Sequence, residues 1–375
     1  MDTPMPSHSE RLVDVFKQIK PRILEMAGYQ SPPQGKVIAK LNQNENPYEL
    51  PDSLKEKILR DICYMDWSRY PENNCSALRK KLARHLGINA DQVVLGNGSN
   101  ALLHVVFTAL IEPGDTVLVS PPSFSLFEHM AGLFQAKIVT VSRNPDFSYD
   151  RDPLIKSVRT VKLTIISSPC NPTGRCMDTE LLTTLLRGTK GLILWDEAYG
   201  EFRQNSAVPL LAKHPNLLIL KTFSKAMGLA GARIGYLLAH PLIAAELQKA
   251  TVPYNLNIFS IQTALRLLDI SRWTEYHIGK ILEQRQFVWD ALNRLDGVEP
   301  FPTEANFILF RVGDGPSVIK KLQDRGILVR NMNGYPRLRN CLRVTIGTPR
   351  ENQLFLDALT EIVQSKKFAR EEVIS

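Results

Sequence analysis

Residues 192–199 read Leu-Ile-Leu-Trp-Asp-Glu-Ala-Tyr, an apolar run that ends in a carboxylate. Such a run is typical of a parallel sheet covered by helices on both faces, because a strand buried on both sides need not alternate apolar with polar residues. Asp196 closes the run, and a buried carboxylate is costly unless a cationic partner meets it. The stretch therefore predicts an α/β fold and marks Asp196 as a candidate functional residue.

Short β-branched runs alternate with helical patterns between about residues 93 and 240. The expected strands are 93–95, 116–120, 137–141, 163–167, 192–196, 217–221 and 234–239. Helical patterns separate several of them, for example at 101–111 and 179–186. This alternation predicts an α/β domain with a mostly parallel seven-stranded sheet flanked by helices.

The pattern changes after Pro253, where strands and helices are separated by loops rich in Gly, Pro and Asn. This change predicts a smaller α+β domain. Its expected elements are helices at 277–295, 317–325 and from 351, and strands at 306–312, 327–330 and 341–346. We expect three parts: an N-terminal arm with part of the small domain (1–50), a large domain (51–262) and a C-terminal small domain (263–375).

The composition of the 375-residue chain excludes several classes of protein. Its 44% hydrophobic and 22% charged residues are ordinary for a soluble globular protein and exclude a disordered or collagen-like chain. The net charge of +8 comes from dispersed Lys and Arg, which favours small anionic ligands over nucleic acid. No apolar run reaches the roughly 18–20 residues of a membrane helix. The N-terminal segment also lacks an apolar signal core. We therefore expect a cytoplasmic protein with neither membrane nor nucleic-acid partners.

Cysteine and histidine give no sign of a metal site or a disulfide framework. The five cysteines are an odd number and include no Cys-x-x-Cys pair. Free thiols in a reducing compartment therefore fit better than a disulfide or zinc scaffold. The seven histidines are isolated from one another along the chain, so we expect no metal.

Residues 96–101, Gly-Asn-Gly-Ser-Asn-Ala, lie between an expected strand and an expected helix and fit the dinucleotide-binding pattern Gly-x-Gly-x-x-Ala. In that pattern an acidic residue ends the next strand. Asp115 instead precedes the strand at 116–120, which argues against a dinucleotide-dependent dehydrogenase. The small residues still allow backbone amides at a helix N-terminus to approach a phosphate, and the helix dipole favours the anion there.

Two further segments place polar residues at the ends of expected strands. Ser-Pro-Cys-Asn-Pro-Thr-Gly at 168–174 holds Asn171 between two prolines, and Thr-Phe-Ser-Lys at 222–225 closes another strand. The carboxyl ends of parallel strands share one edge of the sheet, where ligands bind in such folds. We therefore expect these groups to lie close to Asp196.

The groups at this edge match one cofactor in kind. A lysine can form a Schiff base with an aldehyde, and a carboxylate facing a pyridine nitrogen keeps that ring protonated, so that it withdraws electrons. Asn and Tyr can bond a ring phenolate, while Ser, Thr, Arg and a helix N-terminus can hold a phosphate. Together they indicate pyridoxal 5'-phosphate. A catalytically silent binding protein on this fold would lack Lys225 or Asp196, and both are present.

With these motifs in that order, the sequence resembles the fold-type I, pyridoxal-phosphate-dependent class I/II aminotransferases from about residue 35 to 360. Within that family it is most similar to the histidinol-phosphate aminotransferases. The narrower resemblance rests on Asn-Gln-Asn-Glu-Asn-Pro-Tyr at 42–48, Arg-Tyr-Pro at 69–71, residues 222–233 and Cys-Leu-Arg-Val-Thr-Ile-Gly at 341–347.

The resemblance implies a role for each catalytic residue. Lys225 would hold the cofactor aldehyde as a Schiff base and later move the substrate proton. Asp196 would pair with the ring nitrogen. Asn171 and Tyr199 would bond the ring hydroxyl.

The resemblance also implies how the rest of the cofactor is held. Phe124 would stack on the ring, and Tyr70 would reach the phosphate in the neighbouring subunit, which makes the protein a homodimer with a shared active site. The remaining phosphate contacts would come from Gly98, Ser99, Asn100, Thr222, Ser224 and Arg233.

For the substrate, the resemblance implies that Arg343 clamps a carboxylate and that Arg330 and Tyr29 contact a phosphate, with Asn46 as a further contact. The implied reaction is amino transfer between histidinol phosphate and 2-oxoglutarate in histidine biosynthesis, with ping-pong kinetics. Two alternatives stay open. They are an aromatic-amino-acid aminotransferase, which would share every cofactor residue, and a threonine-phosphate decarboxylase.

Overall fold

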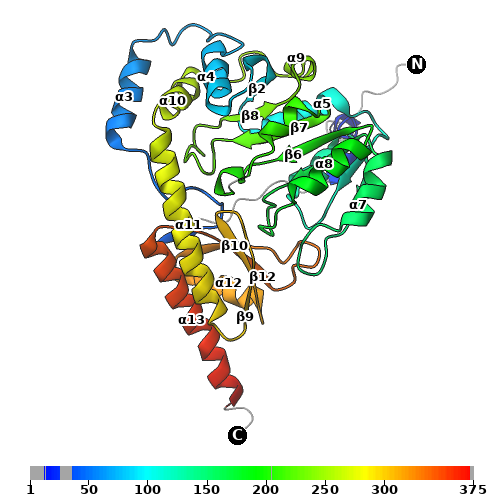
Figure 1. The fold of residues 1–375 in the computed structure, drawn as a ribbon. Helices are drawn as coiled ribbons and strands as arrows, with labels where there is room; N and C mark the ends of the chain where they lie inside the picture. Colours follow the sequence, from blue (N-terminus) through cyan, green and yellow to red (C-terminus); the bar gives the residue numbers. More distant parts are fainter. Residues whose placement is uncertain (1–11, 13, 26–35, 204, 372–375) are drawn as a thin grey trace, which may run out of the picture.

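The structure is a computed structural model that describes residue 12 and residues 14–25, 36–203 and 205–371, with the backbone alone for 365–371. Its described residues form a seven-stranded and a five-stranded sheet. In Figure 1 the larger sheet with its helices occupies the upper part of the molecule and the smaller sheet the lower part, and the long α11 (Ser271–Asn293) runs beside the smaller sheet.

The larger sheet has the strand order β2-β8-β7-β6-β5-β3-β4. Its strands are β2 (Val93–Gly96), β3 (Thr116–Val119), β4 (Lys137–Thr140), β5 (Leu163–Ser167), β6 (Leu192–Asp196), β7 (Leu217–Thr222) and β8 (Gly235–Leu238). Every neighbouring pair is parallel except those that β8 makes, which are antiparallel. The predicted mostly parallel seven-stranded sheet is confirmed.

The direction of β8 follows from the segment before it. Residues 223–234 join β7 to β8, and this fully described segment contains no helix. Parallel neighbours need a crossover connection, usually a helix, so without one the chain returns in the opposite direction.

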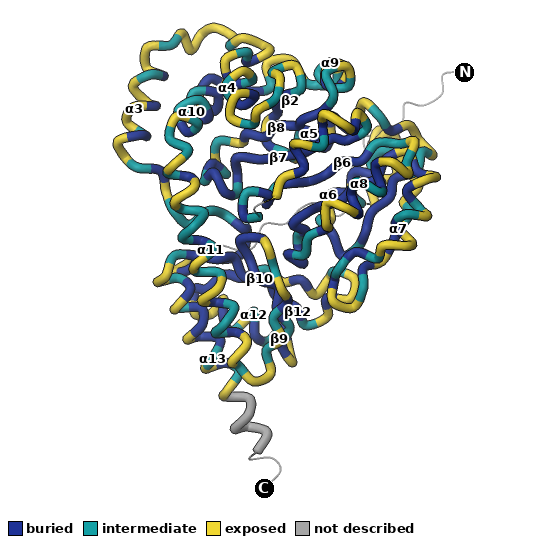
Figure 2. The backbone as a smooth tube through the Cα atoms, in the orientation of Figure 1, coloured by how far each residue is buried: buried dark blue, intermediate teal, exposed yellow. Residues whose placement is uncertain are grey.

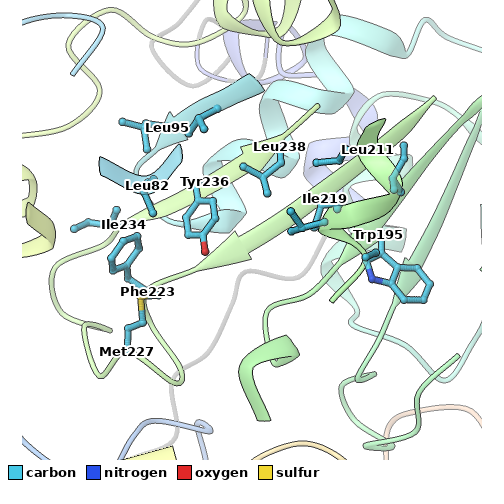
Figure 3. Close-up of a cluster of buried hydrophobic side chains, with 14 of the residues drawn as sticks. Leu82, Leu95, Trp195, Leu211, Ile219, Phe223, Met227, Ile234, Tyr236 and Leu238 are labelled. Carbon is cyan, nitrogen blue, oxygen red and sulfur yellow. The ribbon is translucent and has the colours of Figure 1, made fainter. Parts of the chain in front are cut away.

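Helices cover both faces of the larger sheet because its strands direct apolar side chains to two sides. Trp195 of β6 belongs to one hydrophobic cluster and Leu194 to another. The Leu194 cluster includes α5 (Ser99–Leu110), α6 (Leu126–Leu133) and α9 (Pro241–Lys249). The Trp195 cluster, part of which Figure 3 shows, includes α3 (Asp52–Cys63), α4 (Ser76–Leu86), α7 (Arg151–Ser157), α8 (Thr179–Gly188) and α10 (Ile258–Leu267). Apart from the edge strand β4, the strands are accordingly buried, as Figure 2 shows.

The smaller sheet has the order β1-β11-β12-β10-β9 and includes a strand from the beginning of the described chain. Its strands are β1 (Ala39–Leu41), β9 (Val298–Phe301), β10 (Phe307–Val312), β11 (Ile327–Asn331) and β12 (Cys341–Thr345). β1 pairs with β11 in parallel, and the other pairs are antiparallel. With α11, α12 (Gly315–Asp324) and α13 (Pro349–Glu371), this sheet forms the α+β part. The domain boundaries after residues 50 and 262 stay predictions.

The remaining elements are short. They are α2 (Pro21–Glu25) and the 3-10 segments η1 (Ala90–Gln92), η2 (Val158–Thr160), η3 (Gly200–Phe202) and η4 (Val208–Ala212). Within the described ranges, no helix combines the length and apolar character needed to cross a membrane.

Candidate active site

A cavity of about 300 Å³ lies where the parallel strands β5, β6 and β7 end. Arg330 of β11 and Arg343 of β12 also line it, so residues of both sheets form its wall. The cavity brings together twelve residues predicted from sequence: Ser99, Asn100, Phe124, Asn171, Asp196, Tyr199, Thr222, Ser224, Lys225, Arg233, Arg330 and Arg343. Sequence positions more than two hundred residues apart thus meet at one site, as expected for the carboxyl edge of a parallel sheet.

One end of the cavity is built to hold an anion. α5 begins here at Ser99, so its first backbone amides and its dipole favour negative charge. Arg233 Nη1 donates to Ser224 Oγ at 3.3 Å, and Thr222 Oγ1 donates to the same oxygen at 3.0 Å. A guanidinium, two hydroxyls and a helix N-terminus therefore converge, which is a donor set that suits a phosphate.

Two glycines make this convergence possible. Gly98 has a φ of +79°, and a Cβ on it would lie 2.5 Å from Arg233 Nη2. A Cβ on Gly235, at the start of β8, would lie 2.4 Å from the backbone nitrogen of Ser99. Side chains at either position would displace the groups that form the anion site.

Asp196 lines the cavity and has uncharged hydrogen-bond partners. Its Oδ1 accepts from the backbone nitrogen of Ala198 at 3.0 Å, and its Oδ2 accepts from Ser167 Oγ at 3.1 Å. The residue is 5% exposed, and burial raises the pKa of its carboxyl to about 6. A protonated ring nitrogen in the cavity would supply the cationic partner that so buried an acid needs.

Lys225 is the amine of the site. Its Nζ donates to the backbone oxygen of Gln43 at 2.7 Å and lies 5.8 Å from the centre of the Tyr199 ring. Burial, assisted by the charge of Arg343, lowers the pKa of Lys225 to about 7. A large fraction of the amine is therefore neutral near pH 7 and able to attack an aldehyde.

Asn171 and Tyr199 both line the cavity, and each takes part in a hydrogen bond with another residue that lines it. Tyr199 Oη accepts from Asn44 Nδ2 at 2.9 Å, and burial raises its pKa. Asn171 Oδ1 accepts from Arg343 Nη1, and Arg343 Nη2 donates to the backbone oxygen of Asn42 at 3.0 Å. The network fixes the orientation of Arg343 beside the cavity.

Arg330 and Arg343 are direct register partners on the antiparallel strands β11 and β12. Cross-strand partners project from the same face of a sheet, and both residues line the cavity. Like charges directly opposite each other are unfavourable unless an anion joins them. The pair therefore marks a second anion site, formed by residues of the smaller sheet.

These residues fit pyridoxal phosphate in chemistry: an anion site for the phosphate, a carboxylate for the ring nitrogen, an amine for the aldehyde, and the Asn171 and Tyr199 side chains for the ring hydroxyl. Phe124 lines the same cavity and supplies an aromatic face. The fit to pyridoxal phosphate rests on this set of donors and on the space that Gly98 and Gly235 leave beside them.

Three described residues predicted from sequence, Gly98, Asn46 and Tyr70, do not line the cavity. Asn46 Nδ2 donates to the backbone oxygen of Ala226 at 2.8 Å, so Asn46 supports the lysine segment from outside the cavity. Tyr70 is 80% exposed and stacks on Tyr254 with ring centroids 4.5 Å apart. Tyr29 lies outside the described residues.

The cavity also includes residues that sequence reasoning missed. Asn42 and Asn44 line it: the backbone oxygen of Asn42 accepts from Arg343, and the Asn44 side chain donates to Tyr199. The sequence marks these two residues only as part of the 42–48 segment that carries the resemblance. Tyr335 lines it too, and its Oη donates to Ser125 Oγ at 3.2 Å, across the two parts of the molecule. Tyr335 lies in a turn-rich loop, where its sequence gives no signal of a site.

The chain is similar along almost its whole length to proteins of one family. It matches the family model described as aminotransferase class I and II over residues 36–359. A histidinol-phosphate aminotransferase of Chlorobium phaeovibrioides is 39% identical over 352 residues, which are 93% of this chain and 98% of that protein.

Solved structures show the same similarity in three dimensions. The histidinol-phosphate aminotransferase of Sinorhizobium meliloti in complex with pyridoxal-5'-phosphate has a TM-score of 0.83 at 26% identity, covering 93% of this chain and 98% of that one. That of Clostridium acetobutylicum has a TM-score of 0.82 at 25% identity, covering 88% and 100%.

Proposed function

Because this chain belongs to the class I and II aminotransferases, we propose that it transfers an amino group between histidinol phosphate and 2-oxoglutarate, as a step of histidine biosynthesis. The observation that carries the proposal is the placement of Lys225, Asp196 and the Arg330–Arg343 pair around one cavity. The name of the Chlorobium relative supports the choice of substrate.

Pyridoxal phosphate is the cofactor of the proposed reaction. When bound, it supplies an aldehyde that takes up amino groups and a protonated ring that withdraws electrons from the substrate Cα. Asp196 would keep the ring nitrogen protonated, Asn171 and Tyr199 would bond the ring hydroxyl, and Phe124 would stack on the ring. The phosphate would be held by Gly98, Ser99, Asn100, Thr222, Ser224 and Arg233.

Lys225 would be the proton carrier. Its Nζ would take the proton from the substrate Cα and return a proton at C4′ of the cofactor. Its pKa of about 7 suits both steps, since a group that titrates near the working pH can accept and donate. The second half-reaction repeats these transfers in reverse with the other substrate, which gives ping-pong kinetics.

The two arginines would bind the anionic parts of both substrates. Histidinol phosphate carries a phosphate, and glutamate carries two carboxylates, so a site that serves both needs cations that accept either anion. Arg343 would clamp a carboxylate in a bidentate pair and Arg330 would contact the phosphate. The role of Tyr29 beside Arg330 stays a prediction, and Asn46 would act on substrate only through the lysine segment.

The active unit would be a homodimer. Tyr70 and Tyr254 form one exposed aromatic pair, and Trp67 and Phe259 form another with centroids 5.2 Å apart. Exposed apolar side chains gathered in one place are typical of a protein interface. A second copy on this surface would allow Tyr70 to reach the phosphate in the partner's cavity.

A panel of substrates tests the function. We expect the visible absorbance of the protein reconstituted with pyridoxal phosphate to be lost on mixing with histidinol phosphate, and much more slowly with phenylalanine, tyrosine or threonine phosphate. Faster loss with the aromatic amino acids would favour the aromatic alternative. Release of CO₂ from threonine phosphate would favour the decarboxylase.

The same panel with Arg330→Ala identifies the phosphate contact. A charge-assisted hydrogen bond contributes about 1.5–3 kcal/mol, so kcat/KM should fall about 10–100-fold with histidinol phosphate and little with phenylalanine. Arg339→Ala is the matched control, because Arg339 lies exposed in the loop between β11 and β12 and does not line the cavity. Equal losses with both substrates would contradict the assignment.

A further inference from the structure

The larger sheet carries charged side chains on the face away from the cavity. Successive residues of a strand point to opposite faces. Asp196 and Thr222 line the cavity, so their neighbours Glu197 and Lys221 point to the other side. Lys221 Nζ donates to Glu197 Oε2 at 2.9 Å and lies 2.9 Å from Glu201 Oε1. We call Glu197, Glu201 and Lys221 the buried charge cluster.

The buried charge cluster lies inside an apolar layer. The side chains of Lys221 and Glu197 are 6% and 2% exposed. Lys221 is the register partner of Tyr236, which Figure 3 shows packed among Phe223, Ile219 and other apolar side chains. Replacing a buried ion pair with apolar residues is often neutral or stabilising. Stability alone therefore gives no reason for a charged cluster at this place.

Glu197 is held as an anion by a complete set of donors. Besides Lys221, it accepts from Trp195 Nε1 at 2.9 Å, from Ser206 Oγ at 2.7 Å and from the backbone nitrogen of Ala207 at 2.6 Å. Burial opposes ionisation, but the charge of Lys221 and these donors hold the pKa of Glu197 below its usual range. Glu197 thus places a fixed negative charge directly after Asp196 in the chain.

The charges near Asp196 are not balanced without Lys221. The carboxylates of Glu197, which is buried, and Glu201, which is half-buried, would then add to that of Asp196, whose own partners, Ser167 and Ala198, are uncharged. Nearby negative charges favour the neutral form of an acid. Of the two adjacent acids, Asp196 would take up a proton first, because its pKa is the raised one.

We propose that Lys221 is a positioning residue for the cofactor: its ammonium offsets the charges of Glu197 and Glu201 and thereby keeps Asp196 in the anionic form that faces the ring nitrogen. The inference rests on the proposed function. The other ionisable groups around Asp196 are Tyr199 on the same segment and Lys225 and Arg343 across the cavity. They belong to the cavity face, so variants of the buried charge cluster leave them in place.

The test measures the affinity of the apoprotein for pyridoxal phosphate by fluorescence titration between about pH 5 and pH 9. Each variant is made on a Lys225→Ala background, because the Lys225 amine itself titrates at a pKa of about 7, and on that background the affinity should fall on the acid side as Asp196 is protonated. Lys221→Met should move this acid limb to higher pH by about one unit, which is about tenfold weaker binding on the limb. Glu197→Gln should move the acid limb to lower pH. The double variant, with both Lys221→Met and Glu197→Gln, should return the limb toward its position in the protein with an intact buried charge cluster.

Controls separate this role from a structural one. Lys221→Arg keeps the positive charge and should leave the acid limb in place. Lys162→Met should also leave it in place, because Lys162 pairs with Asp115 at the amino ends of β5 and β3, away from the cavity. A lower unfolding temperature with an unmoved limb in Lys221→Met would overturn the proposal. If Lys221→Met does not fold, Glu197→Gln decides: a shift of the acid limb to lower pH supports the proposal, and no shift or a shift to higher pH overturns it. A wild type that binds no pyridoxal phosphate would instead refute the proposed function.

Discussion

Lys225 shows how strongly the surroundings of one side chain set its chemistry. An exposed lysine carries its proton up to a pKa of 10.5, whereas burial and the charge of Arg343 lower the pKa of Lys225 to about 7. At neutral pH the exposed amine is almost entirely protonated and unreactive, while Lys225 is divided between its two forms. The site therefore provides a nucleophile without a separate base to activate it.

The rate at which the apoprotein captures pyridoxal phosphate should report this pKa. Only the neutral amine attacks an aldehyde, so the rate should rise as the pH rises through about 7 and level off above it. Growth of the visible absorbance band after mixing measures the rate. Lys225→Ala should show no band. An inflection near the ordinary lysine value of 10.5 would contradict the prediction.

The sequence alone was sufficient to predict which residues meet at the cavity where that follows from their position at a strand end. Asp196 and Lys225 lie at or just after the ends of β6 and β7, and strand ends of a parallel sheet converge by geometry. Asn46 shows the limit: it belongs to a recognisable segment, but its side chain bonds the backbone of Ala226 outside the cavity. Membership of a motif does not say which way a side chain points.

At the scale of elements, the approach of β8 to the start of α5 is the contact on which the phosphate end depends. The Cα of Gly235 lies so close to the backbone of Ser99 that there is no room for a Cβ. β8 lies between β2 and β7, so it holds the loop that leads into α5 next to Thr222, at the end of β7, and Ser224, which follows it.

Gly235→Ala should therefore weaken cofactor binding without changing the reacting groups. The added Cβ would lie 2.4 Å from the Ser99 nitrogen and displace the helix N-terminus from the phosphate. We expect a loss of about tenfold or more in affinity, equivalent to about 1.4 kcal/mol, measured by titration of the apoprotein. Gly231→Ala is the control, because a Cβ there meets no atom within 4 Å. Equal affinities of the two variants would rule out this role of the contact.

The hydrophobic patterns of the sequence predicted where the strands lie, but not which strands pair or in which direction. The seven strands of the larger sheet end within one residue of the expected limits, because each is a short apolar run bounded by turn residues. The antiparallel direction of β8 and the pairing of β1 with β11 could not be read in the same way. Pairing across nearly three hundred residues depends on tertiary packing, which no local period records.

At the scale of the whole molecule, the proposed dimer makes each site depend on two chains. Tyr70 belongs to one of the two exposed aromatic pairs, and its side chain does not line the cavity of its own chain. Lys225 lines the cavity of its own chain. The two residues of one complete site would therefore come from different subunits.

Mixing two inactive variants tests this arrangement. Tyr70→Ala and Lys225→Ala should each lose most activity as homodimers, and subunit exchange should form hybrids with one intact site. Random exchange makes half of the dimers hybrid, so activity should recover to about a quarter of the wild type. Mixing Asp196→Ala with Lys225→Ala is the control and should recover nothing, since both defects lie in the same cavity. No recovery in the first mixture would place Tyr70 outside the partner's site.

The pairing of β1 with β11 also bears on the order of events during synthesis. The segment after β1 supplies Asn42 and Asn44 to the cavity wall, and β12 supplies Arg343. Domains generally fold as they emerge from the ribosome, beginning with the N-terminal part. The first described strand has no neighbour in its sheet until β11 has been synthesised, so the part of the cavity wall that Asn42, Asn44 and Arg343 form is completed late in translation.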